Sequence, residues 1–185
     1  ILADVESSRP IVDIDDVKKK ITKKTKVIMP VHMNGRSADM QALVNLARKF
    51  DIHVVEDAAQ AIGSKNNNMF LGTQSDIGCF SLSVAKTIGT GQGGFVVTNN
   101  TELAKRMKNM RTHGVENVKD PKKWNYLGFN FRYTDIMASL GIEQLKKLPM
   151  RLNQAKIVYK LYEKELDNSP FKIIEVNLPN GEVPV

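Results

Sequence analysis

The feature that most constrains the fold of this chain is a cluster of four glycines, at positions 89, 91, 93 and 94. An apolar run that begins at Phe80 leads to the cluster through one lysine, Lys86, and a β-rich run over residues 95–98 follows it. Glycine adopts positive φ angles and lets another backbone or a ligand approach closely, so such a dense cluster indicates a constrained turn. The stretch therefore predicts a strand, a tight loop and a second strand, with Lys86 just before the turn.

Lys86 allows two interpretations. A lysine at the end of a strand is often a solvated cation, because its aliphatic stem lets the ammonium group reach water. Burial instead favours the neutral amine of a lysine, which can attack a carbonyl carbon and form a Schiff base. This stretch alone does not decide between the two.

The glycines also contain the spacing G-x-G-x-x-G, at positions 89, 91 and 94, which is typical of dinucleotide-binding sites. That motif requires a helix directly after the glycines, whereas residues 95–98 predict a strand. The chain contains no G-x-x-x-x-G-K-[ST] run either. Both a dinucleotide fingerprint and a P-loop are therefore excluded.

A second stretch, residues 51–61, is a β-branched strand that ends in an acidic pair, with Asp57 as its second member and Gln60 three residues beyond. Open α/β sheets bind ligands at the carboxyl ends of their strands, which is where Asp57 falls. A strand-terminal aspartate commonly caps a following helix. It can also pair with the pyridine nitrogen of pyridoxal phosphate (PLP) and keep the ring protonated as an electron sink. Asp57, Gln60, Ser81 and Lys86 together favour a PLP site.

With these residues in view, the sequence resembles the DegT/DnrJ/StrS sugar aminotransferases, a family of fold-type I PLP-dependent enzymes. The resemblance spans most of residues 1–148. It implies an α/β fold, namely a PLP-binding large domain with a mostly parallel central sheet flanked by helices. The matching segments occur in the family's order and at its spacing, and they are residues 30–35, 56–61, 80–86, 93–94 and 128–135.

The resemblance implies a role for each candidate residue. Lys86 is the catalytic lysine that binds the cofactor covalently, Asp57 faces its pyridine nitrogen, and Gln60 lies against its ring hydroxyl. Ser81 reaches the phosphate. Asn130 resembles the residue that completes the phosphate site of a neighbouring subunit, with Arg132 as the alternative, and this motif predicts an obligate homodimer.

His32 is a further candidate near the pocket, since it follows a strand predicted over residues 25–31. A single histidine without an orienting partner more often packs or caps than catalyses. We therefore expect His32 near the site but not as the general base. The sequence predicts no metal site.

By resemblance, the function is that of an aminotransferase (EC 2.6.1 type) acting on a nucleotide-linked keto-deoxysugar for polysaccharide, glycan or antibiotic sugar biosynthesis. The amino donor is an amino acid, by resemblance glutamate, and pyridoxamine phosphate is the intermediate cofactor form. Two alternatives stay open, namely a deoxysugar dehydratase of the same family and a non-catalytic, cofactor-binding regulator of the same fold. Related dehydratases carry a histidine at the position of Lys86, which favours transamination here.

The chain differs from the family in what it lacks. Family members begin with a segment that carries a phosphate-binding turn and an aromatic residue stacked on the ring, and they end with a small domain. We therefore expect a fragment, in which residues 1–148 form the central part of the large domain and residues 149–185 a linking helix and the start of the small α/β domain. The predicted activity belongs to the longer parent and not to the fragment alone.

Composition limits the other function classes. The 185 residues suffice for one core, and no apolar run approaches the roughly 18 residues of a membrane span. The formal charge of +7 raises the question of nucleic acid, but the lysines are spread without a dense arm or interleaved aromatics. Anionic ligands would also benefit from this charge. We expect a soluble cytoplasmic protein without nucleic-acid or membrane partners, and the lone Cys79 excludes an internal disulfide.

The periodicity of apolar residues and the turn signals predict the order of elements. Strand, helix and strand over residues 25–56 predict a crossover between two parallel strands. The predicted helices are 13–21, 37–50, 101–111, 135–148 and 150–167, and Pro149 is predicted to separate the last two. The sequence also predicts a surface turn at 66–68, a loop over 115–129 and a strand over 171–176.

Overall fold

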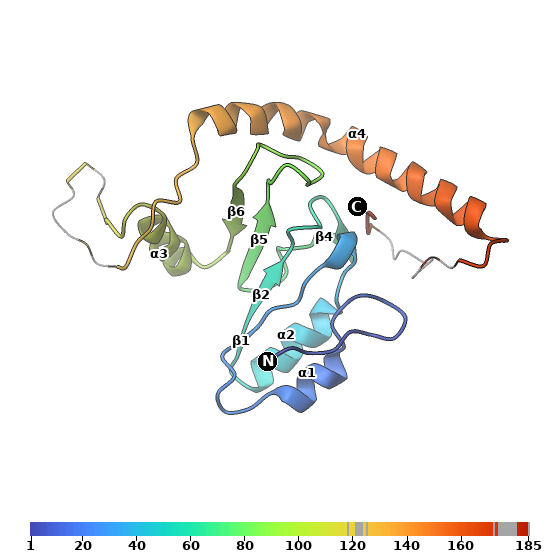
Figure 1. Ribbon diagram of the computed structural model, residues 1–185. Helices are drawn as coiled ribbons and strands as arrows, with labels where there is room; N and C mark the ends of the chain where they lie inside the picture. Colours follow the sequence, from blue (N-terminus) through green and yellow to red (C-terminus); the bar gives the residue numbers. More distant parts are fainter. Residues whose placement is uncertain (118, 121–123, 125, 172, 174–180, 185) are drawn as a thin grey trace.

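The computed structural model describes residues 1–117, 119–120, 124, 126–171, 173 and 181–184. Its centre is a four-stranded sheet in the order β1-β2-β5-β6 (Figure 1). The strands are β1 (Val27–Ile28), β2 (His53–Asp57), β5 (Ile77–Ser81) and β6 (Gly94–Val97).

The sheet is mostly parallel, as the sequence predicted. β1 and β2 are parallel, β2 and β5 are parallel, and β6 runs antiparallel to β5. In this register Asp57 pairs with Cys79 and Ser81 pairs with Gly94. The ends of β2 and β5 that carry the candidate residues therefore lie at the same edge of the sheet.

Helix α1 (Ile14–Lys20) lies at the end of the sheet where β1 begins (Figure 1). The carboxylate of Asp13 caps it by accepting hydrogen bonds from the backbone N–H groups of Asp15 and Asp16. Acidic residues occupy its first turn and three lysines its last, an arrangement that the helix dipole favours. These local signals explain why the sequence alone placed this helix correctly.

Helix α2 (Met40–Lys49) connects β1 to β2 and completes the predicted crossover between parallel strands. The Asp39 carboxylate caps it by accepting from the N–H of Ala42. One face of α2 is buried against α1 and the sheet, which forms the main hydrophobic core. The core residues are Val17, Ile28, Ala38, Met40, Leu43, Leu46, Ala47, Ile52 and Val54.

A small hairpin of β3 (Lys65–Asn66) and β4 (Met69–Phe70) precedes β5. Its two connecting residues, Asn67 and Asn68, both have positive φ angles, of 48° and 64°. Asparagine tolerates this region better than most residues, and two such residues in succession match the backbone of a tight hairpin. The predicted surface turn at 66–68 is confirmed.

Helix α3 (Thr101–Arg111) starts at the predicted residue, where the Asn100 side chain caps it. It ends where His113 and Gly114 adopt positive φ angles, of 58° and 76°. The predicted stop at residues 113–114 is therefore confirmed.

The predicted break at Pro149 is wrong, because α4 (Asp135–Leu166) runs through this proline. Proline lacks an N–H, so the helix loses one internal hydrogen bond there and bends. Figure 1 shows α4 changing direction near its middle. Contacts just beyond the proline hold the second half in place: Arg151 donates to the carbonyl of Thr87, and Leu152 packs on Gly63. The predicted domain boundary between residues 148 and 149 thus falls inside one helix, and the division into two domains stays a prediction.

The predicted strand over 171–176 falls mostly on residues outside those described. Within the described residues, no helix is both long enough and apolar enough to cross a membrane.

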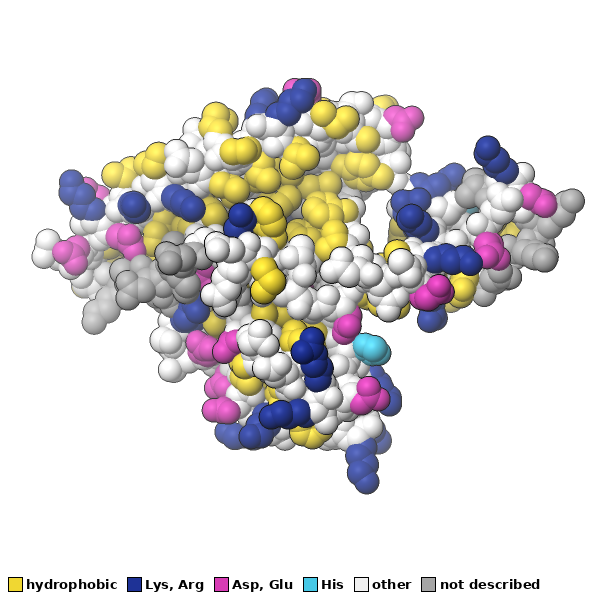
Figure 2. Space-filling view, turned by 180° about the vertical axis from the view of Figure 1, so that it is seen from behind, with side chains coloured by type: hydrophobic (Ala, Val, Ile, Leu, Met, Phe, Trp, Pro, Cys, Tyr) yellow, Lys and Arg dark blue, Asp and Glu magenta, His cyan; other side chains and the backbone are white. Residues whose placement is uncertain are grey.

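Helix α4 buries none of its residues. Figure 2 shows hydrophobic side chains gathered over the upper part of the molecule, where α4 lies above the sheet. An exposed apolar surface of this kind usually marks a site covered by other protein. The exposed hydrophobic residues of α4 are Ile136, Leu140, Ile142, Leu145, Met150, Ile157, Val158, Leu161 and Tyr162, and β6 adds Phe95 and Val96.

We expect Gly78→Ala to destabilise the full-length protein by about 3 kcal/mol. A Cβ atom on Gly78 would lie 1.7 Å from the carbonyl oxygen of Gly72, and a backbone oxygen cannot turn away as a side chain can. Gly141→Ala is the control, since its Cβ would lie 3.4 Å from the Thr90 methyl group, an ordinary contact, and alanine favours the helix. Urea denaturation measures both. Equal stability of Gly78→Ala and wild type would contradict this packing of β5.

Candidate active site

The candidate site lies at the edge of the sheet where β2 and β5 end. The pairing of Asp57 with Cys79 brings the end of β2 beside the end of β5. Ser81 is the last residue of β5, and its hydroxyl accepts a hydrogen bond from the N–H of Ser83 at 3.3 Å. The chain then turns through Lys86 and returns to β6. The fold thus brings Asp57, Ser81 and the Lys86 loop to one edge.

The loop that carries Lys86 lies beneath α4 (Figure 1) and is tied to it and to the segment before it. The Lys86 N–H donates to the carbonyl of Ser83 at 3.1 Å, which closes a turn. Farther along, the Tyr133 hydroxyl donates to the hydroxyl of Thr90. Arg151 of α4 donates to the carbonyl of Thr87 at 2.6 Å. These hydrogen bonds restrain the loop that carries the half-buried Lys86, as the glycine cluster predicted.

The glycines shape this loop for the two predicted reasons. Gly91 and Gly93 have positive φ angles, of 93° and 109°. A Cβ on Gly93 would also lie 2.7 Å from the ring of Tyr133, and one on Gly94 would lie 2.3 Å from the carbonyl of Phe80. Larger residues would therefore push Tyr133 away from the loop or separate β6 from β5.

Asp57 ends β2 half-buried, and residues 58–64 form turns, so it does not cap a helix. One of its carboxylate oxygens accepts a hydrogen bond from the N–H of Ala59 at 3.0 Å. Burial raises the pKa of the Cys79 thiol, and the negative charge of Asp57 raises it further. Gln60 lies close by, with its side-chain oxygen accepting the N–H of Asn34 at 2.9 Å.

His32 and Glu56 form a buried pair behind this edge. Both side chains are 0% exposed, and His32 Nε2 lies 2.9 Å from the Glu56 carboxylate. His32 is thus near the site, but it faces Glu56 and not an open pocket. The sequence analysis overlooked Glu56, although one signal could have found it: Val54 and Glu56 share the buried face of β2, where a carboxylate needs partners.

The Glu56 carboxylate also accepts hydrogen bonds from the loop before β5. The N–H groups of Gly72 and Gln74 donate to it at 2.7 Å each, and the Ser75 hydroxyl donates at 2.9 Å. Burial by itself would raise the pKa of Glu56, but the hydrogen bonds from His32 and these three donors outweigh it and hold the pKa below its ordinary value. Glu56 is therefore ionised at neutral pH.

The side chains of Asn130 and Arg132 contact each other. Both are exposed, and the Arg132 guanidinium donates to the Asn130 side-chain oxygen at 2.9 Å. The Asn130 backbone pairs with Thr112, just beyond the end of α3. Their predicted role toward a neighbouring subunit stays a prediction.

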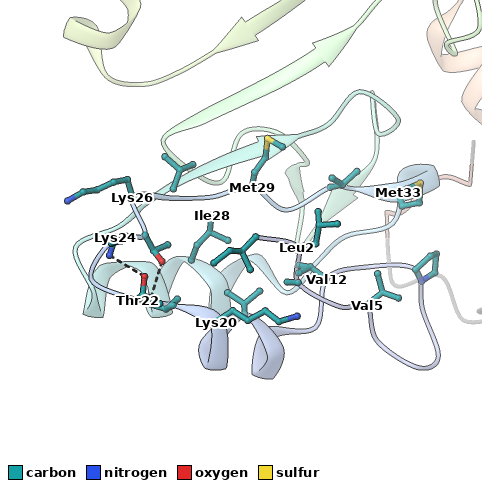
Figure 3. Close-up of a pocket in the computed structure, with 18 residues that line it drawn as sticks. Leu2, Val5, Val12, Lys20, Thr22, Lys24, Lys26, Ile28, Met29 and Met33 are labelled. Carbon is teal, nitrogen blue, oxygen red and sulfur yellow. Dashed lines mark hydrogen bonds between the residues drawn. The ribbon is translucent and has the colours of Figure 1, made fainter.

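A cavity of about 610 Å³ lies between the N-terminal segment, α1 and the segment around β1. Leu2, Ile28 and Met29 lie around it (Figure 3). Asp57, Gln60, Ser81 and Lys86 are not among its lining residues, so this cavity is separate from the predicted site. In the described part of the chain, no group of three or more His, Cys, Asp or Glu side chains is placed to hold a metal ion.

We expect Glu56→Gln to lower the free energy of unfolding by about 3 kcal/mol at neutral pH, since an amide cannot accept from all four donors. The folded-state pKa of Glu56 lies below its ordinary value of 4.5, so the ionised carboxylate stabilises the fold above that pH and this stabilisation is lost as the pH falls below it. The difference between wild type and variant should therefore narrow below about pH 4.5.

Urea denaturation across a pH series measures this difference. The exposed Glu143 of α4 offers the matched control, because Glu143→Gln should change stability by less than about 0.5 kcal/mol. A difference for Glu56→Gln that stays constant down to about pH 4 would contradict the ionised, buried carboxylate.

Comparison with known proteins identifies the family. The sequence profile of the DegT/DnrJ/EryC1/StrS aminotransferase family matches residues 1–181. The chain is 33% identical over 174 residues to GDP-perosamine synthase of Vibrio cholerae, which covers 94% of this chain and 47% of that protein. The chain spans about half the length of the curated relatives it matches.

Solved structures agree in fold. The Helicobacter pylori aminotransferase PseC, involved in the biosynthesis of pseudoaminic acid, superposes with a TM-score of 0.87 at 29% identity, covering 92% of this chain and 46% of PseC. The Escherichia coli GDP-4-keto-6-deoxy-D-mannose-3-dehydratase, with bound hydrated PLP, gives 0.86 at 25% identity, covering 98% of this chain and 50% of that one. Sequence and fold together show that this chain belongs to the DegT/DnrJ/EryC1/StrS aminotransferase family.

Proposed function

We propose that the full-length protein is a PLP-dependent aminotransferase that moves an amino group from an amino acid, glutamate by resemblance, to a nucleotide-linked keto-deoxysugar. The observation that carries this proposal is the placement of Lys86 in a held loop at the same edge of the sheet as Asp57 and Ser81. The names of several relatives, among them GDP-perosamine synthase, support a nucleotide-sugar substrate. A cytoplasmic location and a role in polysaccharide, glycan or antibiotic sugar biosynthesis stay predictions.

The residues at this edge fit PLP by their chemistry. They offer a carboxylate for the pyridine nitrogen, a hydroxyl for the phosphate and a primary amine for the aldehyde carbon, namely Asp57, Ser81 and Lys86. When bound, PLP supplies an electron sink for negative charge that develops on a substrate carbon beside its ring. Asp57 would keep the proton on the ring nitrogen, and Gln60, held by the N–H of Asn34, would orient the ring.

Lys86 would have two tasks. Its amine would hold the cofactor covalently and so keep the cofactor in the site between turnovers. The same amine, when free, would act as general base and acid toward the substrate carbon. Its turn, closed by Ser83 and tied to α4 at Thr87, limits the positions from which the amine can act.

Dehydration of a deoxysugar is the second candidate, because one solved relative is named as a dehydratase. Dehydratases that resemble this family carry a histidine at the position of Lys86. Here the position is a lysine, and its neighbours Val84, Ala85 and Thr87 offer no imidazole. His32 is engaged with Glu56 in the interior. These observations favour transamination.

Product analysis tests the proposal. We expect full-length protein, given PLP, glutamate and a nucleotide-linked keto-deoxysugar, to release 2-oxoglutarate and amino sugar in equal amounts. Lys86→Ala should lose the borohydride-trapped bond to PLP and at least about a thousandfold of the rate, while the exposed Lys23→Ala keeps both. A deoxy keto sugar with release of ammonia, and no stable amino sugar, would instead establish a dehydratase.

We further propose that the full-length protein is a homodimer with its sites at the subunit interface. Asn130 and Arg132 support this arrangement, since they lie in a family motif yet are exposed and bonded to each other. The exposed apolar residues of α4 and β6 supply surface that other protein would cover.

Mixed dimers test this arrangement. We expect a Lys86→Ala protein, mixed with an Asn130→Ala/Arg132→Ala protein under subunit exchange, to regain about a quarter of the wild-type sites, because half of the statistical dimers contain one intact site. Each variant alone serves as the control. Mass spectrometry confirms that heterodimers have formed, and their inactivity would show that each site is built from a single chain.

A further inference from the structure

The buried Glu56 carboxylate joins three segments that meet behind the candidate site. One is the segment before and within the short 3₁₀ turn η1 (Met33–Gly35), reached through His32. The second is β2 itself, which carries Glu56. The third is the loop from Gly72 to Ser75, which donates three hydrogen bonds to the carboxylate. We call these contacts the Glu56 cluster.

The cluster encloses the backbone of Asp57. The N–H of Asp57 donates to the carbonyl of Pro30 at 2.9 Å, and its carbonyl accepts from the N–H of His32 at 3.0 Å. The side chain of the same His32 turns back to Glu56, the residue before Asp57. This closed ring of contacts restrains the backbone angles of Asp57 and so the direction of its carboxylate.

The same segment also holds Gln60. Two residues after His32, Asn34 has a positive φ angle of 50°, which turns its N–H toward the Gln60 side-chain oxygen. Displacement of His32 would therefore move the donor that holds Gln60. Among the described residues His32 Nδ1 has no hydrogen-bond partner, so the Glu56 contact is what orients the imidazole.

On the other side, the cluster supports the start of β5. The loop from Gly72 to Ser75 leads into β5, which ends at Ser81, and the loop after β5 carries Lys86. The carbonyl of Gly72 packs so closely on Gly78 that a Cβ there would lie at 1.7 Å. Glu56 thus connects every strand that contributes a candidate residue.

We propose that His32 and Glu56 are positioning residues for PLP, which hold Asp57 and Gln60 in the orientation that binds the cofactor ring. Neither touches substrate, because both side chains are fully buried. The inference rests on the proposed function, and it assigns to His32 a role other than that of a base. A buried carboxylate that loses a donor shifts toward other partners or water, and Asp57 is the adjoining residue.

Two substitutions of His32 in the full-length protein separate the alternatives. His32→Gln removes the imidazole but keeps an N–H donor that can reach Glu56, whereas His32→Leu keeps similar bulk and removes the donor. We expect His32→Leu to weaken PLP binding at least about tenfold and His32→Gln by no more than about threefold. Only His32→Leu should change the pH dependence of the visible absorption of bound PLP.

Two measurements keep positioning distinct from simple loss of stability. PLP affinity is determined on the folded fraction, by titration of gel-filtered apoprotein. Hydrogen exchange of the amides over residues 57–61 in the apoprotein should be faster in His32→Leu than in His32→Gln. Equal PLP affinity, absorption and exchange in wild type and His32→Leu would overturn the inference and leave the pair a packing feature.

If His32→Leu fails to fold, Ser75→Ala decides. It removes one of the four donors to Glu56 from the side opposite to His32, and we expect a loss of PLP affinity of about threefold; unchanged affinity would overturn the inference. The wild-type titration separates this result from failure of the proposed function. Wild type that binds no PLP would reject both, whereas normal binding by wild type and every variant would reject the positioning role alone.

Discussion

The structure depends on one buried carboxylate, that of Glu56. Placing an ionised group in a protein interior is costly unless hydrogen bonds replace its hydration. Four donors do so here, from His32, Gly72, Gln74 and Ser75. Because each donor comes from a different position along two separate segments, the carboxylate is satisfied only when these segments pack against β2 in one arrangement. A charge in the interior thereby specifies how the edge of the sheet is built.

The loop that carries Lys86 is constrained from a different direction. β6 returns antiparallel to β5, which closes the base of the loop, and α4 holds its far side through Arg151. This contact also ties α4 to the loop just beyond Pro149, where the helix bends. One hydrogen bond thus joins the second half of α4 to the loop that carries Lys86.

Much of the surface around α4 and β6 has the character of an interior. Hydrophobic side chains such as Ile136 and Leu161 are exposed along α4 (Figure 2). The relatives are about twice as long as this chain. The candidate residues meet at the edge of the sheet beneath α4, next to this apolar surface, so additional protein that covers it would also enclose the site and exclude water from it.

The sequence by itself determined the local features of this protein, including the strands around Lys86, the acidic end of β2 and the starts of α1 and α3. These features depend on φ preferences, alternation and capping within a few residues, so they can be identified from short stretches. The family resemblance added the roles of the candidate residues. Tertiary contacts decided the rest. The role of Glu56 requires donors up to 24 residues away, and the contact that ties α4 to the Lys86 loop joins Arg151 to Thr87, 64 residues earlier. Contacts between residues so far apart leave no local pattern, because neither partner's preference depends on the other until the chain has folded.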